Sequence, residues 1–303
     1  MKFKALYAFT MVLLLFFSII TSANSIKINQ SDYKSSNFEK FDDIEYYALV
    51  IGVEIYQDKN FTDSMHNYAD KIDDGAIKMY DLIKRSKNFK EENIKMILNE
   101  NASSQKIKEN ITIWLDDKED KNDVVLIVIA GHAWRMPLAN RSEGNAFYFS
   151  YDVSTFEYTK NAVTDVELDS WVDTLESQHI VVIFDTCYSG RMLAMRQNCR
   201  TILTAGGKYF FCPVDEHYSL GSGIFTYFLI QGFNGVADLN NDGWVTAKEA
   251  FFYARKPVIW FSLWAHFPYL QLFSEDLLFV GPQIPYLYDC HIGIIKLYEY
   301  NKE

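Results

Sequence analysis

Residues 179–190 read HIVVIFDTCYSG, and the rest of the chain is best interpreted outward from them. Residues 180–184 form a continuous apolar, mostly β-branched run, which is typical of a strand buried on both faces of a sheet. The run ends abruptly in small and polar residues that include Asp185 and Cys187. Open α/β sheets place their chemistry just past the carboxyl ends of such strands. Cys187 is therefore a candidate nucleophile.

A second buried strand of the same kind is predicted at residues 124–130, and it ends in Gly131, His132 and Ala133. Of the six histidines, His132 is the one that lies just past the carboxyl end of a buried strand, as Cys187 does. An imidazole near a thiol takes its proton and later returns it to the leaving group. The pattern predicts a Cys187–His132 pair. The alternative is a buried cysteine and an unrelated loop histidine.

Further strands and helices alternate along the chain. Strands are expected at residues 46–53, 94–98 and 201–205, with a short surface strand at 146–151, and helices at 73–85, 104–115, 166–175 and 224–233. This alternation predicts an α/β fold with a mostly parallel central sheet and helices on both faces. Residues 292–298 are interpreted as an added strand or a surface tail.

The composition limits the class of protein. With 303 residues, of which 49% are hydrophobic, the chain is long enough to bury a sizeable core. Its net charge of −11 argues against nucleic acid as a partner, because phosphate binding needs a basic surface.

The first residues have the pattern of a targeting segment. Lys2 and Lys4 precede an uncharged apolar run at residues 5–20, and small residues follow up to Ala23. We interpret residues 1–23 as a cleaved signal peptide and 24–44 as a linker, which predicts a secreted protein. The alternative is an uncleaved anchor that holds the protein on the outer face of a membrane.

The chain has four cysteines, which are too few for a disulfide scaffold at this length. Cys199 and Cys212 flank a predicted strand and form a possible disulfide pair. Buried thiols are the equally weighted alternative.

Residues 238–249 read DLNNDGWVTAKE and match the loop pattern of an EF-hand calcium site. Gly243 stands where the loop turns sharply, and predicted helices flank the segment. The expected Ca²⁺ ligands are Asp238, Asn240, Asp242, Trp244 (through its carbonyl), Thr246 and Glu249. The alternative is an Asx-rich turn that holds no ion.

A strand ending in Gly131-His132, followed by a strand ending in D-T-C-Y-S-G, resembles the caspase, metacaspase and legumain group of cysteine peptidases. The Asp-x-Cys-x-Ser-Gly form is most similar to metacaspases and their prokaryotic relatives. The likeness extends over most of residues 46–254. It implies a caspase-like three-layer sandwich at residues 45–281, including the calcium loop, with a tail at 282–303.

The resemblance implies roles for the residues that match its motifs. Cys187 would be the nucleophile and His132 the general base and acid. The backbone N–H groups of Cys187 and Ala133 would form the oxyanion hole. Members of the family have glycine at the position of Ala133, so alanine would be strained there if the position needs a positive φ.

Substrate preference follows from the same resemblance. Asp185 matches an acid that holds a basic P1 side chain in metacaspases, and its partner acid would be Asp73 or Asp74. Two carboxylates favour Arg or Lys at P1. A plainer role for Asp185 is to cap a backbone N–H.

The expected protein is thus a secreted, calcium-stabilised cysteine endopeptidase that acts on peptides or proteins. Three alternatives are open: a legumain-like peptidase cleaving after Asn, an inactive caspase-like surface binding protein, and a calcium-stabilised adhesion module.

Overall fold

The computed structural model describes residues 44–66, 73–135, 146–192, 195–196, 200–207, 216–217, 220, 222–266, 283–290 and 294–300. The segments interpreted as signal peptide and linker therefore lie almost wholly outside the described residues, as do Cys199 and Cys212. No helix within these ranges is long and apolar enough to cross a membrane.

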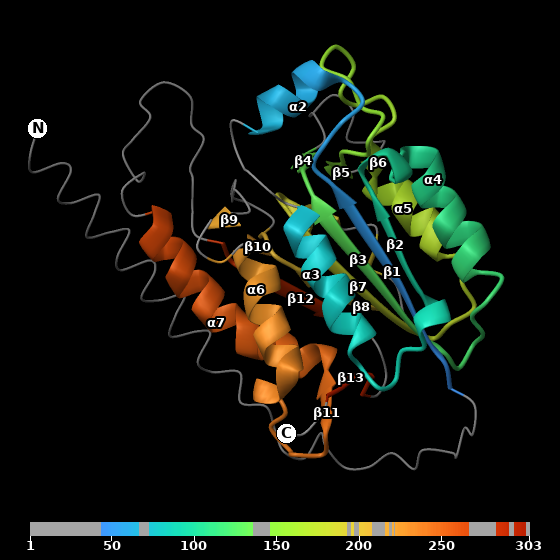
Figure 1. The fold of residues 1–303 in the computed structure, drawn as a ribbon, viewed down its shortest axis with the longest axis vertical. Coiled ribbons are helices and arrows are strands. Elements are labelled where there is room, and N and C mark those ends of the chain that lie inside the picture. Colours follow the sequence, from blue (N-terminus) through green and yellow to red (C-terminus); the bar gives the residue numbers. More distant parts are fainter. Residues whose placement is uncertain are drawn as a thin grey trace, which may run out of the picture. The chain divides into compact units, whose positions relative to one another are not determined.

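A six-stranded sheet with strand order β12-β8-β7-β3-β1-β2 forms the centre of the described part of the chain (Figure 1). Its strands are β1 (Tyr46–Val53), β2 (Ile94–Leu98), β3 (Val124–Gly131), β7 (His179–Thr186), β8 (Arg200–Thr204) and β12 (Tyr286–Asp289). All neighbours pair in parallel except β12, which runs antiparallel to β8. The predicted α/β fold with a mostly parallel sheet is confirmed.

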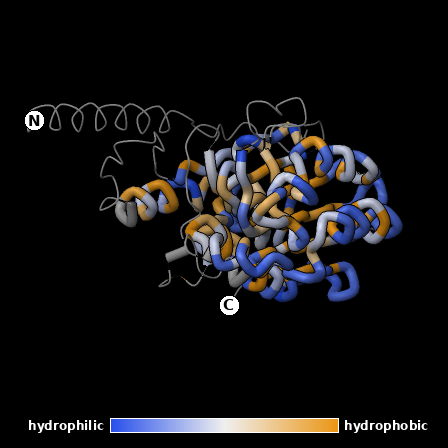
Figure 2. Tube along the Cα trace, turned by 90° about the horizontal axis from the view of Figure 1, so that it is seen from above, coloured by the Kyte–Doolittle hydropathy of each residue, from blue (hydrophilic) through white to orange (hydrophobic). Residues whose placement is uncertain are grey.

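The central strands are buried on both faces, as their continuous apolar runs predict. In β1, Leu49 and Ile51 face one hydrophobic cluster, whereas Ala48 and Val50 face the other. Figure 2 shows the hydrophobic residues concentrated in these strands and the hydrophilic ones on the outer loops.

Helices cover both faces of the sheet (Figure 1). The helices on one face are α3 (Asp73–Lys84), α6 (Ile224–Gln231) and α7 (Ala247–His266), and those on the other are α4 (Ser104–Glu109), its π-helical continuation η4 (Asn110–Leu115) and α5 (Asp165–Val172). The expected helices are present at all these places. The helix predicted after the calcium-type loop is α7, and it continues through Pro257 to His266.

One short helix and a small three-stranded sheet come after the carboxyl ends of β1 and β3. Helix α2 (Lys59–His66) follows β1, and a small antiparallel sheet of β4 (Ala133–Arg135), β5 (Ala146–Tyr148) and β6 (Val163–Thr164) follows β3. The short strand expected at residues 146–151 is therefore present as β5, but its three residues are buried rather than at the surface, because β4 and β6 flank it on both sides.

Residues from the C-terminal part form two further strands. β12 extends the edge of the central sheet, whereas β13 (Lys296–Glu299) pairs with β11 (Trp244–Thr246). The predicted added strand at residues 292–298 corresponds to β13, whereas β12 is not foreseen from the sequence. A further short pair joins β9 (Glu216–His217) and β10 (Ser222–Gly223).

Candidate active site

The register of β3 and β7 brings His132 and Cys187 to the same edge of the sheet. The last paired residues of these parallel strands are Gly131 and Thr186, so His132 and Cys187 are the next residue on each strand. Paired strands lie ~4.8 Å apart. His132 is 7% exposed and Cys187 9% exposed. The two predicted residues therefore leave adjacent strands at one level, within a largely buried environment.

Gly131 makes the turn that separates β3 from β4. Its φ is +145°, and a Cβ at this position would lie 2.8 Å from the Val53 carbonyl oxygen and 2.9 Å from the Tyr148 hydroxyl. That hydroxyl donates a hydrogen bond to the Ala130 carbonyl (2.9 Å) and so closes the space from the other side. Only glycine meets both demands, the positive φ and the missing Cβ.

Ala133 begins β4 and pairs with Tyr148. It is not among the described non-glycine residues with positive φ, which are Asn99, Asn161, Tyr188 and Asn241. The strain considered for an alanine at this position is therefore absent, since the unusual backbone conformation lies at Gly131 instead.

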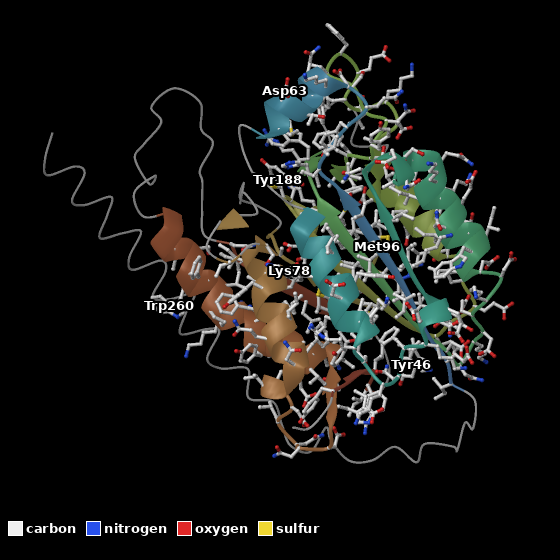
Figure 3. The ribbon with its side chains drawn as sticks, in the orientation of Figure 1. Tyr46, Asp63, Lys78, Met96, Tyr188 and Trp260 are labelled. Carbon is white, nitrogen blue, oxygen red and sulfur yellow. The ribbon has the colours of Figure 1, made fainter. Side chains whose placement is uncertain are left out.

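The segment after Cys187 turns sharply. Tyr188 has the left-handed conformation (φ 51°, ψ 14°), which is uncommon for a bulky residue. Its carbonyl accepts a hydrogen bond from the Arg191 N–H (2.8 Å). Trp134 meets the Tyr188 ring edge-on, with centroids 5.2 Å apart, and the two rings cluster with Cys187. Figure 3 shows Tyr188 at the end of the sheet opposite Tyr46, where β1 begins.

Tyr56 also belongs to this site, although the sequence analysis did not single it out. It lies just past the carboxyl end of β1 and is 3% exposed. Its ring centroid is 6.4 Å from that of His132. The available signal was its position, because β1 is the third strand whose carboxyl end reaches this edge.

Asp185 is fully buried beside the start of helix α6. Its Oδ2 accepts hydrogen bonds from the Thr226 backbone N–H (3.2 Å) and from the Thr226 hydroxyl. Its Oδ1 is buried and has no hydrogen-bond partner among the described residues. Burial raises the pKa of Asp185 to about 6, and the bonds from Thr226 oppose this rise. Asp185 thus caps a backbone N–H and also retains one unused acceptor.

Asp73 and Asp74 begin helix α3, and their side chains lie outside what the structure describes. The next residue, Gly75, packs near α6, because a Cβ placed on it would lie 3.8 Å from the Thr226 hydroxyl. Thr226 is the residue that bonds Asp185. The start of α3 therefore lies near Asp185, and the choice between Asp73 and Asp74 stays open.

The calcium-type loop is folded by its own side chains. The loop has positive φ at Asn241 (58°) and at Gly243 (92°). Asp238 Oδ2 accepts from the Gly243 N–H (2.9 Å) and from the Tyr300 hydroxyl (2.9 Å). Burial raises the pKa of Asp238, but these hydrogen bonds outweigh burial and the pKa lies below its ordinary value.

The end of the loop is the start of α7. Thr246 and Glu249 bond reciprocally: Glu249 Oε2 accepts from the Thr246 N–H (2.9 Å), and Thr246 Oγ1 accepts from the Glu249 N–H (3.1 Å). This is the capping-box arrangement at a helix start. Glu249 Oε1 and Asp238 Oδ1 are both buried without a hydrogen-bond partner in the described structure.

These two unused oxygens fit a bound cation, because a buried carboxylate oxygen without a partner is unfavourable. Asp242 is a third expected ligand, but its Oδ2 forms an ion pair with the Lys296 ammonium (2.8 Å). Within the described ranges no three His, Cys, Asp or Glu side chains gather closely enough to hold a metal. Ion binding would therefore require Lys296 to release Asp242.

Residues 47–196 match the family model described as metacaspase, peptidase C14 domain. Both Cys187 and His132 lie inside this span. This half of the chain is similar to a metacaspase-type cysteine peptidase domain. The matched span ends before the calcium-type loop at 238–249.

Solved structures share the fold of this chain. The chain resembles protein GSU0716 from Geobacter sulfurreducens at 12% identity, with a TM-score of 0.52 over 80% of this chain and 92% of that one. It also resembles caspase-1 from Spodoptera frugiperda at 10% identity, with a TM-score of 0.50 over 86% and 92%. No curated protein sequence matches the chain. At such identities the likeness shows the caspase-like fold, and a domain of this type takes peptides or proteins as substrates.

Proposed function

We propose that this protein is a cysteine endopeptidase in which Cys187 is the nucleophile and His132 the general base and acid. The observation that carries the proposal is the register of β3 and β7, which ends with these two residues side by side. A thiol and an imidazole at adjacent strand ends provide both groups that thiol-based acyl transfer needs.

The reaction follows from these groups. His132 takes the thiol proton, and the Cys187 sulphur attacks the peptide carbonyl to form a tetrahedral intermediate. The N–H groups of Cys187 and Ala133 would donate to its oxyanion. The intermediate collapses to a thioester while His132 gives its proton to the departing amine. Water, deprotonated by His132, then hydrolyses the thioester and regenerates the thiol.

We propose that the enzyme cleaves after Arg or Lys. The support is the unused Oδ1 of Asp185, a buried acceptor at the edge where Cys187 lies. A carboxylate at the start of α3, from Asp73 or Asp74, would provide the second charge, and two carboxylates bind a guanidinium or ammonium group well.

We further propose that the loop at residues 238–249 binds Ca²⁺ as a structural ion. Asp238 and Glu249 would supply their unused oxygens, with further ligands from Asn240, Asp242, Trp244 and Thr246. The ion would hold the turn between α6 and α7 in place. Export through residues 1–23 is proposed from the sequence alone, and it would expose the loop to abundant calcium.

The test of activity compares wild type with Cys187→Ala on a peptide library that varies P1. We expect wild type to cleave after Arg and Lys and Cys187→Ala to lose at least a thousandfold in kcat/KM. Cys290→Ala is the matched control, because that thiol lies just after edge strand β12 and donates to the Tyr288 hydroxyl (2.8 Å). Undiminished cleavage by Cys187→Ala would reject the proposed nucleophile, and cleavage after Asn would replace the basic preference with a legumain-like one.

The burial of Cys187 beneath Trp134 and Tyr188 favours one other function, a binding protein that has lost catalysis on the same fold. An irreversible probe with a basic P1 residue and a thiol-reactive group separates the two. No labelling of Cys187, with or without calcium, would support the binding protein.

A further inference from the structure

Tyr56 is held rigidly against the candidate active site. Thr62 fixes its backbone in both directions: its Oγ1 accepts from the Tyr56 N–H (2.9 Å) and donates to the Tyr56 carbonyl (3.2 Å). Phe61 meets the Tyr56 ring edge-on at 4.8 Å. Both contacts come from helix α2, so this helix sets the position of the Tyr56 ring next to His132.

The hydroxyl of Tyr56 is buried and donates no hydrogen bond to the described residues. Leaving a buried donor unsatisfied is unfavourable, so such groups usually have a use. Burial raises the pKa of Tyr56 well above its ordinary value, as do the charges of Tyr148, Glu54 and Cys187, whereas the His132 backbone opposes the rise. The hydroxyl therefore stays protonated and can act as a hydrogen-bond donor.

A buried hydroxyl that donates to no described residue, on a ring whose centroid lies 6.4 Å from that of His132, is a donor available at the sheet edge where Cys187 also lies. Hydrogen-bond donors and oriented dipoles stabilise an anion strongly where water is excluded, as it is at this edge of the sheet. The ring of Tyr56 also restricts the imidazole of His132, which has to face the thiol to take its proton.

We propose that Tyr56 is a positioning residue of the Cys187–His132 pair: its ring orients the His132 imidazole, and its buried hydroxyl favours the thiolate of Cys187. The proposal rests on the proposed cysteine peptidase function. It assigns Tyr56 a part in activating the nucleophile, and it gives α2 the task of holding Tyr56 in place.

Other charged and titratable groups near Tyr56 and Cys187 also influence the pH dependence of the thiol, so a test has to leave them unchanged. Glu54, Tyr148 and the His132 backbone influence the pKa of Tyr56. Tyr188 follows Cys187 in the chain, and the charges of Arg135 and Arg191 oppose the rise of its pKa. Replacing Tyr56 by Phe keeps all of these and the ring, and it removes only the hydroxyl.

The test measures the rate at which iodoacetamide alkylates Cys187 between pH 4 and pH 10, with mass spectrometry of the Cys187 peptide. In Tyr56→Phe we expect the midpoint of the profile to move upward and alkylation at pH 7 to slow roughly tenfold. The limiting rate at high pH should be unchanged, because the thiolate itself is intact. A profile that superimposes on wild type would overturn the proposal.

Tyr298→Phe is the matched control, because the hydroxyl of Tyr298 is also buried and donates to the Leu82 carbonyl (3.0 Å) from strand β13. We expect this variant to lower stability without moving the alkylation profile. An equal shift in both variants would show a general effect of lost stability and would reject the role of Tyr56.

A second variant keeps the proposal testable if Tyr56→Phe does not fold. Thr62→Val removes both side-chain hydrogen bonds that fix the Tyr56 backbone, and it should move the midpoint in the same direction by a smaller amount. No movement would count against the proposal.

Peptide cleavage by wild type separates this proposal from the one on which it rests. If wild type cleaves peptides and Tyr56→Phe alkylates as wild type does, only the role of Tyr56 fails. If wild type cleaves no peptide while Tyr56→Phe shifts the profile, the peptidase assignment fails and the effect of Tyr56 on the thiol stands.

Discussion

At the residue scale, Gly131 and Asp185 are two tightly constrained positions of the candidate active site. Gly131 has a positive φ and has backbone and hydroxyl atoms where a Cβ would lie. Asp185 has one oxygen bonded to Thr226 and one without a partner. The sequence identified both segments, but it did not show that the backbone strain lies at Gly131 rather than at Ala133.

Asp185 makes stability depend on pH. Its pKa is raised from 3.8 to about 6 by burial, so the folded state disfavours its charged form. The stabilising contribution of the protonated group is complete below pH ~4 and is lost as the pH rises to about 6. We expect the free energy of unfolding to fall by about 3 kcal/mol across this range on account of Asp185.

Asp185→Asn is the comparison that isolates this effect, because it cannot ionise and nearly keeps the side-chain shape. The difference in unfolding free energy between wild type and Asp185→Asn, from denaturant titrations at pH 4 and pH 7, should change by that amount. A difference that is the same at both pH values would mean that Asp185 ionises as it does in the unfolded chain.

At the element scale, the buried strands were the most predictable. The expected bounds of the first two strands equal those of β1 and β2, because short, mostly apolar runs bounded by polar residues leave little choice. β7 extends one residue before and two residues after its apolar core, since pairing with β3 continues to Thr186. β12 was missed because Tyr286–Asp289 is short and only partly buried, so its sequence resembles a loop.

The loop between α6 and α7 allows a test of ion binding. Adding Ca²⁺ at about a hundred times its dissociation constant should raise the unfolding free energy by about 2.7 kcal/mol. Lys296→Ala should bind Ca²⁺ more tightly than wild type, because the ammonium no longer competes for Asp242. Calorimetric titration and thermal unfolding with and without a chelator measure both effects.

Glu249→Gln is the control for this loop, since glutamine preserves the capping arrangement with Thr246 but removes the charge. It should fold and lose the response to Ca²⁺. Unchanged melting temperatures in wild type and Lys296→Ala at millimolar Ca²⁺ would contradict a calcium site.

At the scale of the whole molecule, the mostly parallel sheet and its two covered faces followed from the alternation of strands and helices, whereas the strand order did not. What the sequence could not show is where the last residues attach. Strand β13 pairs with β11 and also bonds the loop after α3, where Asn88 donates to the Leu297 carbonyl (3.0 Å) and accepts from the Glu299 N–H (2.9 Å). Such distant partners leave no periodic signal in a single sequence.

Deleting residues 294–303 should therefore unfold or strongly destabilise the domain. Ile295, Leu297 and Tyr298 are buried in the cluster beneath α3 and α6, and burying each contributes about 1.5–3 kcal/mol. We expect a loss of roughly 5 kcal/mol, measured by thermal and denaturant unfolding. Deleting residues 301–303 alone should change little, and a near-native melting temperature for the longer deletion would show that β13 is dispensable.

The attachment of β13 also sets the order in which the protein can fold. The Ser86 hydroxyl donates to the Glu299 carbonyl across 213 positions of the chain, so this bond forms only after nearly the whole chain has been synthesised. Contacts between residues so far apart in the chain slow folding. Until they form, the hydrophobic surfaces that they would bury stay exposed to solvent. A chain still being made thus lacks the strand that pairs with β11, and the apolar surface that this strand covers stays open to unwanted association until residues 296–299 have been added.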